Sequence, residues 1–468
     1  MSVSNGMNRH SFTLAAIVAL GVLLHVINVD YPDRPVFDEA HFATYAADYA
    51  YRRPHLDIHP PLGKTIYAAA ILLFDQNPPD ESRFVKIEKD SRSTNILYEV
   101  LDRPYGGFPY IALRLTNAVF GILLPVFAYL FLRQIVSGTL IPLLAAFFIL
   151  VENSLLVETR LILLNGMYLA FGLAALTCFF HRQRRKPLLG GILWGFALNV
   201  KLLALGFSGP VIISLLVDRD IPLATRIRNA AAFFFAGIGV FLILLAALNS
   251  FFVPVDERIS YYQTLIPWIS RSAPEDAFPN APAMFRTVLP HAKATLVELN
   301  TILSGYTVGV DSHPAQSNWY LWPFMVGPIL YFPDALQDAL AAVMNGAAGI
   351  IVLMGNPVVW FGGTAAVIWI FVDILRRGKQ IILEKYRIPL LLLGGYALSL
   401  LPFMTVVKRV AFLYHYFPGL IFSILLTSFL VGKSIEAQSP RRRFQLLLSV
   451  IALAVGGFIL ISPYTFGW

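Results

Sequence analysis

Long, uninterrupted apolar runs are the feature that most restricts the fold of this chain. Of its 468 residues, 57% are hydrophobic and only 14% are charged. The apolar residues gather in runs of about 20, the length that a helix needs to cross the hydrocarbon core of a bilayer. A water-soluble domain of ordinary composition does not concentrate its apolar residues in this way. The sequence therefore predicts an all-α polytopic membrane protein.

Eleven segments are predicted to span the membrane. The first has no convincing small-residue cleavage site, so it is interpreted as a retained span rather than a removed signal peptide. The fifth and sixth are short and meet at Lys201, which leaves one bent unit as an alternative. The predicted spans cover residues 12–30, 110–132, 139–157, 161–181, 187–200, 202–217, 229–253, 349–373, 388–407, 411–432 and 444–462.

The basic residues are concentrated in short loops between these spans. The formal net charge of +8 therefore follows the positive-inside rule of membrane proteins, and no nucleic-acid partner is expected. With eleven spans and a cytoplasmic N-terminus, all of these loops fall on the cytoplasmic side. They cover residues 182–186, 219–228, 376–387 and 433–443.

Two long polar segments, 31–109 and 254–348, fall on the opposite side together with the C-terminus. The first holds an apolar run after two prolines, which predicts a helix that starts at Pro60. The second is rich in tryptophan and tyrosine, which favour the membrane interface. We therefore expect interfacial helices in both segments and one transmembrane domain over residues 1–468.

Two adjacent carboxylates, Asp38 and Glu39, follow the first span directly. A carboxylate there can accept a proton from an attacking hydroxyl or stabilise positive charge on a sugar carbon. An acidic pair at a helix N-terminus is an equally good structural explanation. His41 and Asp38 have the spacing of a metal pair on a helix, but a third ligand is not evident, so no metal is expected.

Basic residues near the same membrane face are candidates for an anionic site. His59 and Lys64 flank the start of the predicted helix, where free N–H groups favour phosphate; a proline-defined helix start with a snorkelling lysine is the alternative. Four other cations lie within or beside spans and need carboxylate partners or an anionic ligand. These four are Arg114, Arg160, Lys201 and Arg409. Glu152 or Glu158 is a candidate partner for Arg160.

Seven sequence blocks, in order along the chain, resemble the dolichyl-phosphate-mannose protein O-mannosyltransferases of the GT-C superfamily. Each block is weak alone, and their order makes the resemblance strong. They are 37–42 (FDEAHF), 57–64 (DIHPPLGK), 110–114 (YIALR), 152–164, 313–323 (HPAQSNWYLWP), 355–360 (GNPVVW) and 412–416 (FLYHY).

The resemblance implies a GT-C-like fold and inverting transfer of mannose from a polyprenyl (dolichyl-type) phosphate to Ser or Thr hydroxyls of proteins. Asp38 would orient or deprotonate the hydroxyl, and Glu39 would support it or hold the acceptor backbone. No metal or other cofactor is expected. The donor phosphate would be bound by His59, Lys64, Arg114, Arg160, Lys201 and Arg409. The residues expected to line the acceptor region are His41, His313, Trp319, Trp322 and His415.

Two departures from the family pattern affect these expectations. Asn165 stands where the family commonly has an acidic residue. The segment 254–348, with its 95 residues, looks too short for the accessory β-trefoil domain of the eukaryotic members. The compact form resembles prokaryotic members, which implies a plasma membrane location with the site on the external face (the ER membrane in a eukaryote). A dimer remains open.

Two other functions are compatible with the residues. A related GT-C transferase that glycosylates a lipid or glycan, such as an aminoarabinose transferase, would share the acidic loop and the basic site. The tryptophan-rich block at 313–323 favours the protein-directed family. A flippase for a polyprenyl-linked sugar would also need charges in the membrane. Its inverted repeats are not evident here.

Overall fold

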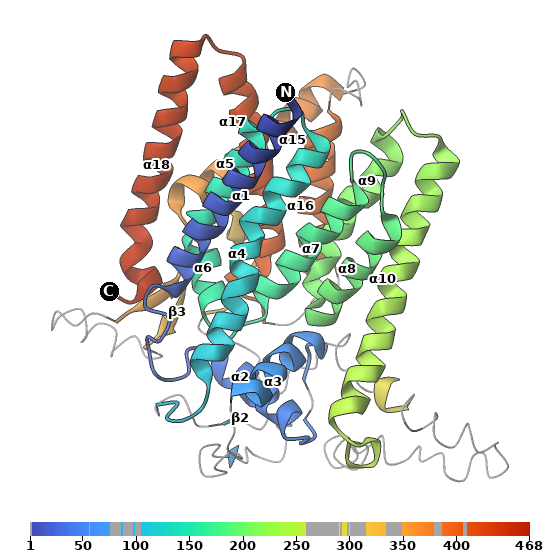
Figure 1. The fold of residues 1–468 in the computed structure, drawn as a ribbon, viewed down its shortest axis with the longest axis vertical. Coiled ribbons are helices and arrows are strands. Elements are labelled where there is room, and N and C mark those ends of the chain that lie inside the picture. Colours follow the sequence, from blue (N-terminus) through green and yellow to red (C-terminus); the bar gives the residue numbers. More distant parts are fainter. Residues whose placement is uncertain are drawn as a thin grey trace.

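The structure, a computed structural model, is a bundle of apolar helices capped at one end by two short helices (Figure 1). It describes residues 2–55, 57–74, 86–87, 97–98, 104–258, 290, 293–296, 299, 315–333, 349–378, 386–405 and 410–468. Within these residues, six helices are long and apolar enough to cross a membrane, or seven if one bent pair forms a single span. The prediction of a polytopic membrane protein is therefore confirmed.

The helices pack in two rows. One row runs in the order α1, α4, α7, α8 and α10, and the other holds α9, α16, α17, α15 and α18, with α5 joining the rows. The bounds are α1 (Ser2–Val26), α4 (Tyr110–Ile135), α5 (Leu140–Leu150), α6 (Asn153–Arg160), α7 (Asn165–Phe179), α8 (Pro187–Val200), α9 (Gly209–Val217), α10 (Leu223–Phe252), α15 (Pro357–Arg377), α16 (Arg387–Thr405), α17 (Phe417–Glu436) and α18 (Pro440–Phe466).

Each predicted span overlaps one of these helices, although the count of eleven crossings stays a prediction. Four predicted spans correspond to shorter apolar helices, which are Phe12–Val26, Asn165–Phe179, Pro187–Val200 and Leu202–Val217. The predicted start at residue 349 is wrong, because the strand β4 (Ile351–Leu353) comes first and α15 begins only at Pro357. The helix starts there because Asn356 caps it, accepting from the backbone N–H groups of Val358 and Val359.

The span predicted at 139–157 is bent rather than straight. α5 and α6 meet at an angle of 60°. α6 starts afresh after Glu152, whose side chain accepts from the backbone N–H of Ser154 at 3.2 Å and so caps the second helix. The same carboxylate accepts from the backbone N–H of Asn356 at 3.1 Å. Two sequence blocks more than two hundred positions apart therefore meet at this bend.

Small residues bring α8 and α10 into close contact. A Cβ added to Gly191 would lie 2.3 Å from the carbonyl oxygen of Phe233, and one added to Gly195 would lie 2.6 Å from that of Gly237. Apolar side chains gain little from leaving lipid for another apolar surface, so close backbone approach at small residues is how membrane helices associate. The pair α8–α10 is therefore fixed firmly at the edge of the bundle.

The two ends of the bundle differ in charge. The 182–186 loop and the start of α16 meet at Asp218, which forms ion pairs with Arg185 and, at 2.6 Å, with Arg387. The N-terminus lies at this basic end, and α2 and α3 lie at the other, as does the C-terminal end of α18 (Figure 1). Termini at opposite ends are what an odd number of crossings requires.

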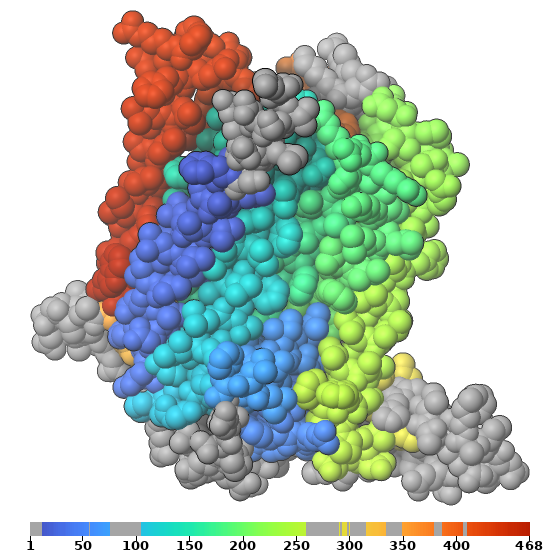
Figure 2. Space-filling view, in the orientation of Figure 1, coloured from blue at the N-terminus to red at the C-terminus, as the bar shows by residue number. Residues whose placement is uncertain are grey.

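The first polar segment folds into α2 (Glu39–Ala50) and α3 (Leu62–Phe74). Figure 2 shows this segment packed against the bundle between the ends of α4 and α10, and α3 contacts both helices. The helix predicted from Pro60 begins two residues later, at Leu62. Whether these helices lie on the membrane surface stays a prediction.

Two small antiparallel sheets were missed by the all-α prediction. β1 (Lys86–Ile87) pairs with β2 (Leu97–Tyr98), and β3 (Ile329–Phe332) pairs with β4 across an irregular register. The strands are too short to show a period-two pattern in the sequence. β3 matters for function because it carries Tyr331 to the end of the bundle where α2 begins.

Candidate active site

Asp38 stands at the N-terminus of α2 with an available carboxylate. Its backbone oxygen accepts from the N–H groups of His41 and Phe42, both at 3.1 Å. Its half-buried side chain makes no hydrogen bond or ion pair within the part of the chain that the structure describes. A carboxylate at a helix N-terminus interacts favourably with the positive end of the helix dipole.

The residue before Asp38 has an unusual backbone. Phe37 has φ = 49°, in the left-handed region that bulky residues rarely adopt. Its ring stacks on Tyr331 with centroids 4.5 Å apart and planes 8° apart. Backbone strain of this kind persists where the surroundings over-determine it, and such positions cluster at functional sites. Here it sets the direction in which the chain enters α2 at Asp38.

Glu39, by contrast, is wholly buried and fully bonded. Arg114 donates to it through Nε at 2.9 Å and through Nη2 at 2.8 Å. Glu39 also accepts from the backbone N–H groups of Val36 at 3.0 Å and Ile162 at 2.7 Å. Arg114 is equally buried and bonds the carbonyl of Pro32 at 2.8 Å. The pair therefore fixes the loop that carries Asp38.

Three residues of the second motif form a buried cluster. Lys64 Nζ donates to Asp57 Oδ2 at 2.7 Å, and His59 Nδ1 bonds Asp57 Oδ1 at 3.1 Å. Burial alone would raise the pKa of Asp57, but the charges of Lys64 and His59 outweigh it and lower that pKa. The side chain of Lys64 is 2% exposed. Its charge is neutralised within the protein, and His59 remains the more accessible of the two basic groups.

Lys201 lies where α8 ends and joins a chain of polar side chains. Its Nζ donates to Asn165 Oδ1 at 2.9 Å and lies 4.8 Å from the ring centre of Tyr414. Asn165 Nδ2 donates to Glu158 at 2.8 Å, and Tyr331 donates to the other oxygen of Glu158. Burial first, and then the charge of Glu158, raise the pKa of Tyr331 well above its usual value, so Tyr331 stays a donor.

These groups converge on one region. Phe37, the residue before Asp38, stacks on Tyr331 and also packs against Tyr414, the ring that lies beside Lys201. The start of α3 is tied to the end of α8, because the N–H of Leu62 donates to Asn199 at 3.3 Å. Burial lowers the pKa of His59, the charge of Lys201 adding to the effect. A carboxylate therefore lies near an ammonium and an imidazole at one end of the bundle.

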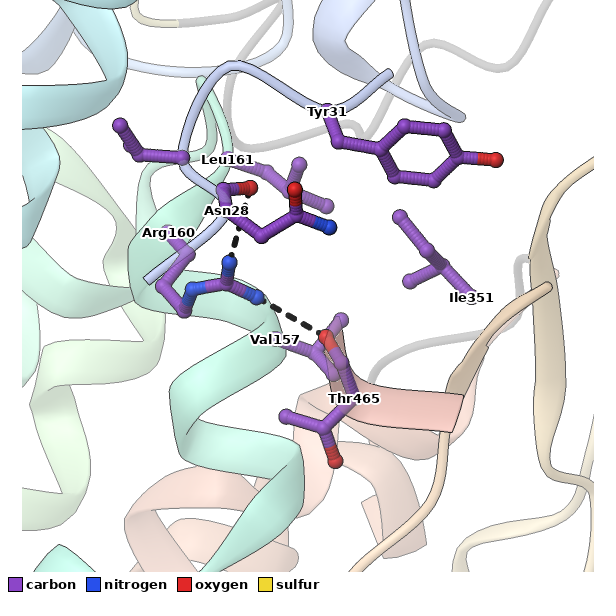
Figure 3. A pocket seen from close by; sticks show the side chains of 8 residues that line it. Asn28, Tyr31, Val157, Arg160, Leu161, Ile351 and Thr465 are labelled. Atoms are coloured by element: carbon purple, nitrogen blue, oxygen red, sulfur yellow. Dashed lines mark hydrogen bonds between the residues drawn. The ribbon is translucent and has the colours of Figure 1, made fainter. Parts of the chain in front are cut away.

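The structure places Arg160 away from this region. Figure 3 shows its guanidinium between Thr465 and Asn28, where it donates to the backbone oxygen of Thr465 at 2.9 Å and to that of Asn28 at 3.0 Å. It also donates to the carbonyl of Ile27. Neither Glu152 nor Glu158 forms an ion pair with it among the described residues. Arg160 therefore joins the ends of α1 and α18 through their free carbonyls.

The tryptophan block packs against His415, the residue after Tyr414. Trp322 is fully buried, donates to Ser317 Oγ at 2.9 Å and stacks on His415 with centroids 6.0 Å apart. Trp319 is half-buried in the same 3-10 turn, η4 (Trp319–Phe324). His41 is half-buried and stacks on Tyr45 at 6.4 Å. Trp322 and His415 thus meet, and the ring of His415 in turn lies 4.5 Å from that of Tyr414.

Two predicted site residues, His313 and Arg409, lie outside the described residues. In the described ranges no three His, Cys, Asp or Glu side chains gather as a metal site would require, and the absence of a metal stays a prediction. Sequence reasoning missed the roles of Tyr331 and Glu158 in this region. It noted Asn165 only as a departure from a pattern, whereas in the structure Asn165 bridges Lys201 and Glu158.

Comparisons with known proteins identify the family of this chain. A family model described as dolichyl-phosphate-mannose-protein mannosyltransferase matches residues 15–255, and one described as the C-terminal four-helix membrane region of protein O-mannosyltransferase matches residues 293–468. The polyprenol-phosphate-mannose–protein mannosyltransferase of Mycolicibacterium smegmatis is 22% identical over 97% of this chain and 89% of its own length. The mannosyltransferase 5 of Candida albicans is 33% identical over 38% of this chain and 22% of its own length.

Solved structures show the same fold. The protein O-mannosyltransferase Pmt1–Pmt2 complex of S. cerevisiae, bound to the sugar donor, covers 98% of this chain and 90% of its own with a TM-score of 0.69 at 14% identity. The Archaeoglobus fulgidus oligosaccharyltransferase covers 98% of this chain and 56% of its own with a TM-score of 0.52 at 12% identity. The fold is therefore that of membrane glycosyltransferases. The chain belongs to the dolichyl-phosphate-mannose–protein mannosyltransferase family.

Proposed function

We propose that this protein transfers mannose from a polyprenyl phosphate to Ser or Thr hydroxyls of proteins, with inversion at the sugar carbon. One observation carries the proposal. At the end of the bundle opposite the basic loops, the carboxylate of Asp38 is held without a hydrogen-bonding partner among the described side chains, while Glu39 beside it is fully bonded. A single positioned base is what a one-step displacement needs.

The reaction balances with these groups. The acceptor oxygen attacks C1 of the mannose and forms the new C1–O bond, while the C1–O bond to the phosphate breaks. The proton of the hydroxyl passes to Asp38, and the polyprenyl phosphate leaves with the electron pair of the broken bond. Because attack and departure occur on opposite faces of C1 in one step, the configuration inverts. Glu39 and Arg114 position Asp38 through the loop that they hold.

The phosphate gains a negative charge as it leaves, and cations must stabilise it. Lys201 and His59 are the groups that we assign to this task. The charge of Lys201 reaches His59, and Lys201 lies over the ring of Tyr414, which packs against Phe37 beside Asp38. A bound phosphate adds negative charge beside His59 and so favours its protonated form. Lys64, Arg114 and Arg160 are assigned supporting roles instead, since carboxylates or backbone carbonyls already occupy their donors.

The active site is proposed to face away from the cytoplasm. Basic loops favour the cytoplasmic side, and the end that carries Asp38 is the opposite one (Figure 1). In a prokaryote this is the external face of the plasma membrane. The whole chain is proposed to act as one catalytic unit without a separate accessory domain. Whether it pairs with a second chain is left to measurement.

The test is transfer of radiolabelled mannose from polyprenyl-phosphate-mannose to a Ser/Thr-rich peptide by purified protein in detergent. Asp38→Asn is expected to lower kcat about 10²- to 10⁴-fold, the range for loss of a general base. Asp33→Asn is the matched control, because Asp33 lies in the same loop with its side chain 63% exposed. Equal loss in both variants, or none in either, would overturn the proposal.

The same assay separates the alternatives. Donor binding by the wild type without transfer to peptide would point to a lipid or glycan acceptor. Family membership favours the protein acceptor over this alternative. A flippase is not retained, because the family is one of transferases.

A further inference from the structure

A basic cavity lies at the end of the bundle opposite Asp38, where α8 and α10 begin. Its volume is about 680 Å³, and its walls come from the 182–186 loop, the first turn of α8 and the first turns of α10. Nothing in the transfer reaction uses this end of the molecule. The cavity therefore needs an explanation of its own.

The cavity carries positive charge that the protein does not balance. Four cations line it, namely Arg184, Arg185, Lys186 and Arg228, and no carboxylate is among the lining residues. The nearby acid Asp218 is buried and shared between Arg185 and Arg387. Asp218 and the exposed Asp220, which precedes the lining residue Ile221, cannot together neutralise these four cations and Arg387, so the cavity attracts an anion.

Arg185 has a buried donor that the protein does not satisfy. One of its terminal nitrogens donates to Asp218, and its guanidinium lies 5.2 Å from the ring centres of Phe179 and Phe180. The other, Nη1, is buried and has no hydrogen-bond partner among the described residues. A buried donor left unsatisfied is costly. A ligand oxygen would satisfy it.

The cavity also has an apolar wall at the level of the membrane interface. Leu188 and Leu189 line it with exposed fractions of 62% and 43%. They belong to the first turn of α8, whose free backbone N–H groups add to the attraction for an anion. A small soluble anion would gain nothing from two leucines. A molecule with a phosphate at one end and methylene groups at the other matches both walls.

We propose that this cavity binds an anionic phospholipid, with its phosphate among the four cations and its glycerol and first methylenes against Leu188 and Leu189. Basic pockets between membrane helices on the cytoplasmic side are suited to anionic lipid headgroups. The bound lipid would hold the starts of α8 and α10 together. The proposal is independent of mannose transfer, because the residues that line the cavity are different from those of the candidate active site.

The test measures the affinity of purified protein for phosphatidylglycerol, added to neutral phosphatidylcholine nanodiscs and followed by native mass spectrometry without any mannose donor. Each juxtamembrane cation contributes a factor of about five to such binding, so removing two weakens it about 30-fold. The variant is Arg184→Gln with Arg228→Gln; both side chains are exposed and make no hydrogen bond within the described ranges, so folding is preserved.

Matched variants keep the test specific. Arg376→Gln with Arg442→Gln removes two exposed cations from the same end of the bundle but outside the cavity, and binding is expected to stay within about twofold of wild type. Arg184→Lys with Arg228→Lys keeps the charges and should retain most of the affinity. Equal weakening by both Gln pairs would show non-specific attraction and overturn the proposal.

The source of the phosphate is tested separately. Glycerol 3-phosphate, which carries the anion without acyl chains, is expected to compete at least a hundredfold more weakly than phosphatidylglycerol. Equal competition would mean a site for free phosphates and would overturn the assignment to lipid. Equal binding of phosphatidylglycerol and phosphatidylcholine by the wild-type protein would also overturn the assignment to an anionic lipid.

Discussion

Cations at the two ends of this bundle differ in how deeply they are buried and how they are paired. Near Asp38, Arg114 and Lys64 are buried and held by Glu39 and Asp57 at 2.8 and 2.7 Å. At the opposite end, Lys433 pairs with Glu436 at 3.1 Å while 53% exposed. Arg184 and Arg228 are exposed there and form no ion pair within the described residues. Removing one partner of a buried ion pair costs much stability, because the other charge is left buried and unpaired. Removing one partner of an exposed pair costs little, because water solvates the remaining charge.

The difference teaches that a cation in a membrane segment does not by itself mark a phosphate site. Of the cations proposed to bind the donor, two are neutralised by carboxylates and Arg160 is bonded to three backbone carbonyls. Lys201 instead contacts a neutral amide, Asn165. The charge available to a substrate is the one that the protein has not neutralised.

The largest predicted difference sets one buried pair against one exposed pair. Glu39→Gln leaves the guanidinium of Arg114 buried without a counter-charge and is expected to lower the free energy of unfolding by about 3–5 kcal/mol. Glu436→Gln, at the basic end, is expected to cost at most about 1 kcal/mol. Thermal unfolding midpoints in detergent measure both. Similar midpoints for the two variants would contradict the claim that the buried pair near Asp38 stabilises the fold more than the exposed pair at the basic end.

A second comparison separates the donor region from the helix-end contact around Arg160. Asn165→Ala removes the amide between Lys201 and Glu158, and Asn153→Ala removes an amide that donates to Thr465 Oγ1 at 2.8 Å. Each loss is expected to cost about 1–3 kcal/mol of stability. Only Asn165→Ala should also raise the KM for the lipid donor, about tenfold. A comparable KM increase in Asn153→Ala would contradict this division.

A third comparison concerns the pH dependence of stability through Asp48 in α2. Burial, opposed by Arg53, raises the pKa of Asp48 from 3.8 to about 7. The folded state thus holds a proton that the unfolded chain releases above pH 3.8, so stability falls as pH rises from about 4 to about 7. The slope is at most about 1.4 kcal/mol per pH unit. The unfolding midpoint of Asp48→Asn should not fall with pH over this range. If the midpoint of the variant depends on pH as that of the wild type does, the assignment to Asp48 is refuted.

The sequence predicted the helices and the motif positions because both are local properties. Apolar runs specify spans, and Asp38, His59 and Lys201 were singled out from their positions relative to those runs. Partners were harder to predict. Glu39 and Arg114 are 75 positions apart, and the carbonyls that bind Arg160 are free only because α1 and α18 end beside it. The short strand that carries Tyr331 has no periodic signal at all.

The most direct measurement of the central claim compares donor affinity and turnover in Asp38→Asn and Lys201→Gln. If Asp38 is the base and Lys201 binds the donor phosphate, Asp38→Asn keeps the Kd for polyprenyl-phosphate-mannose and loses kcat. Lys201→Gln then weakens the Kd about tenfold or more, as expected for loss of a charged hydrogen bond. If Asp38→Asn loses donor binding while Lys201→Gln binds normally, the assignment of the two residues is contradicted.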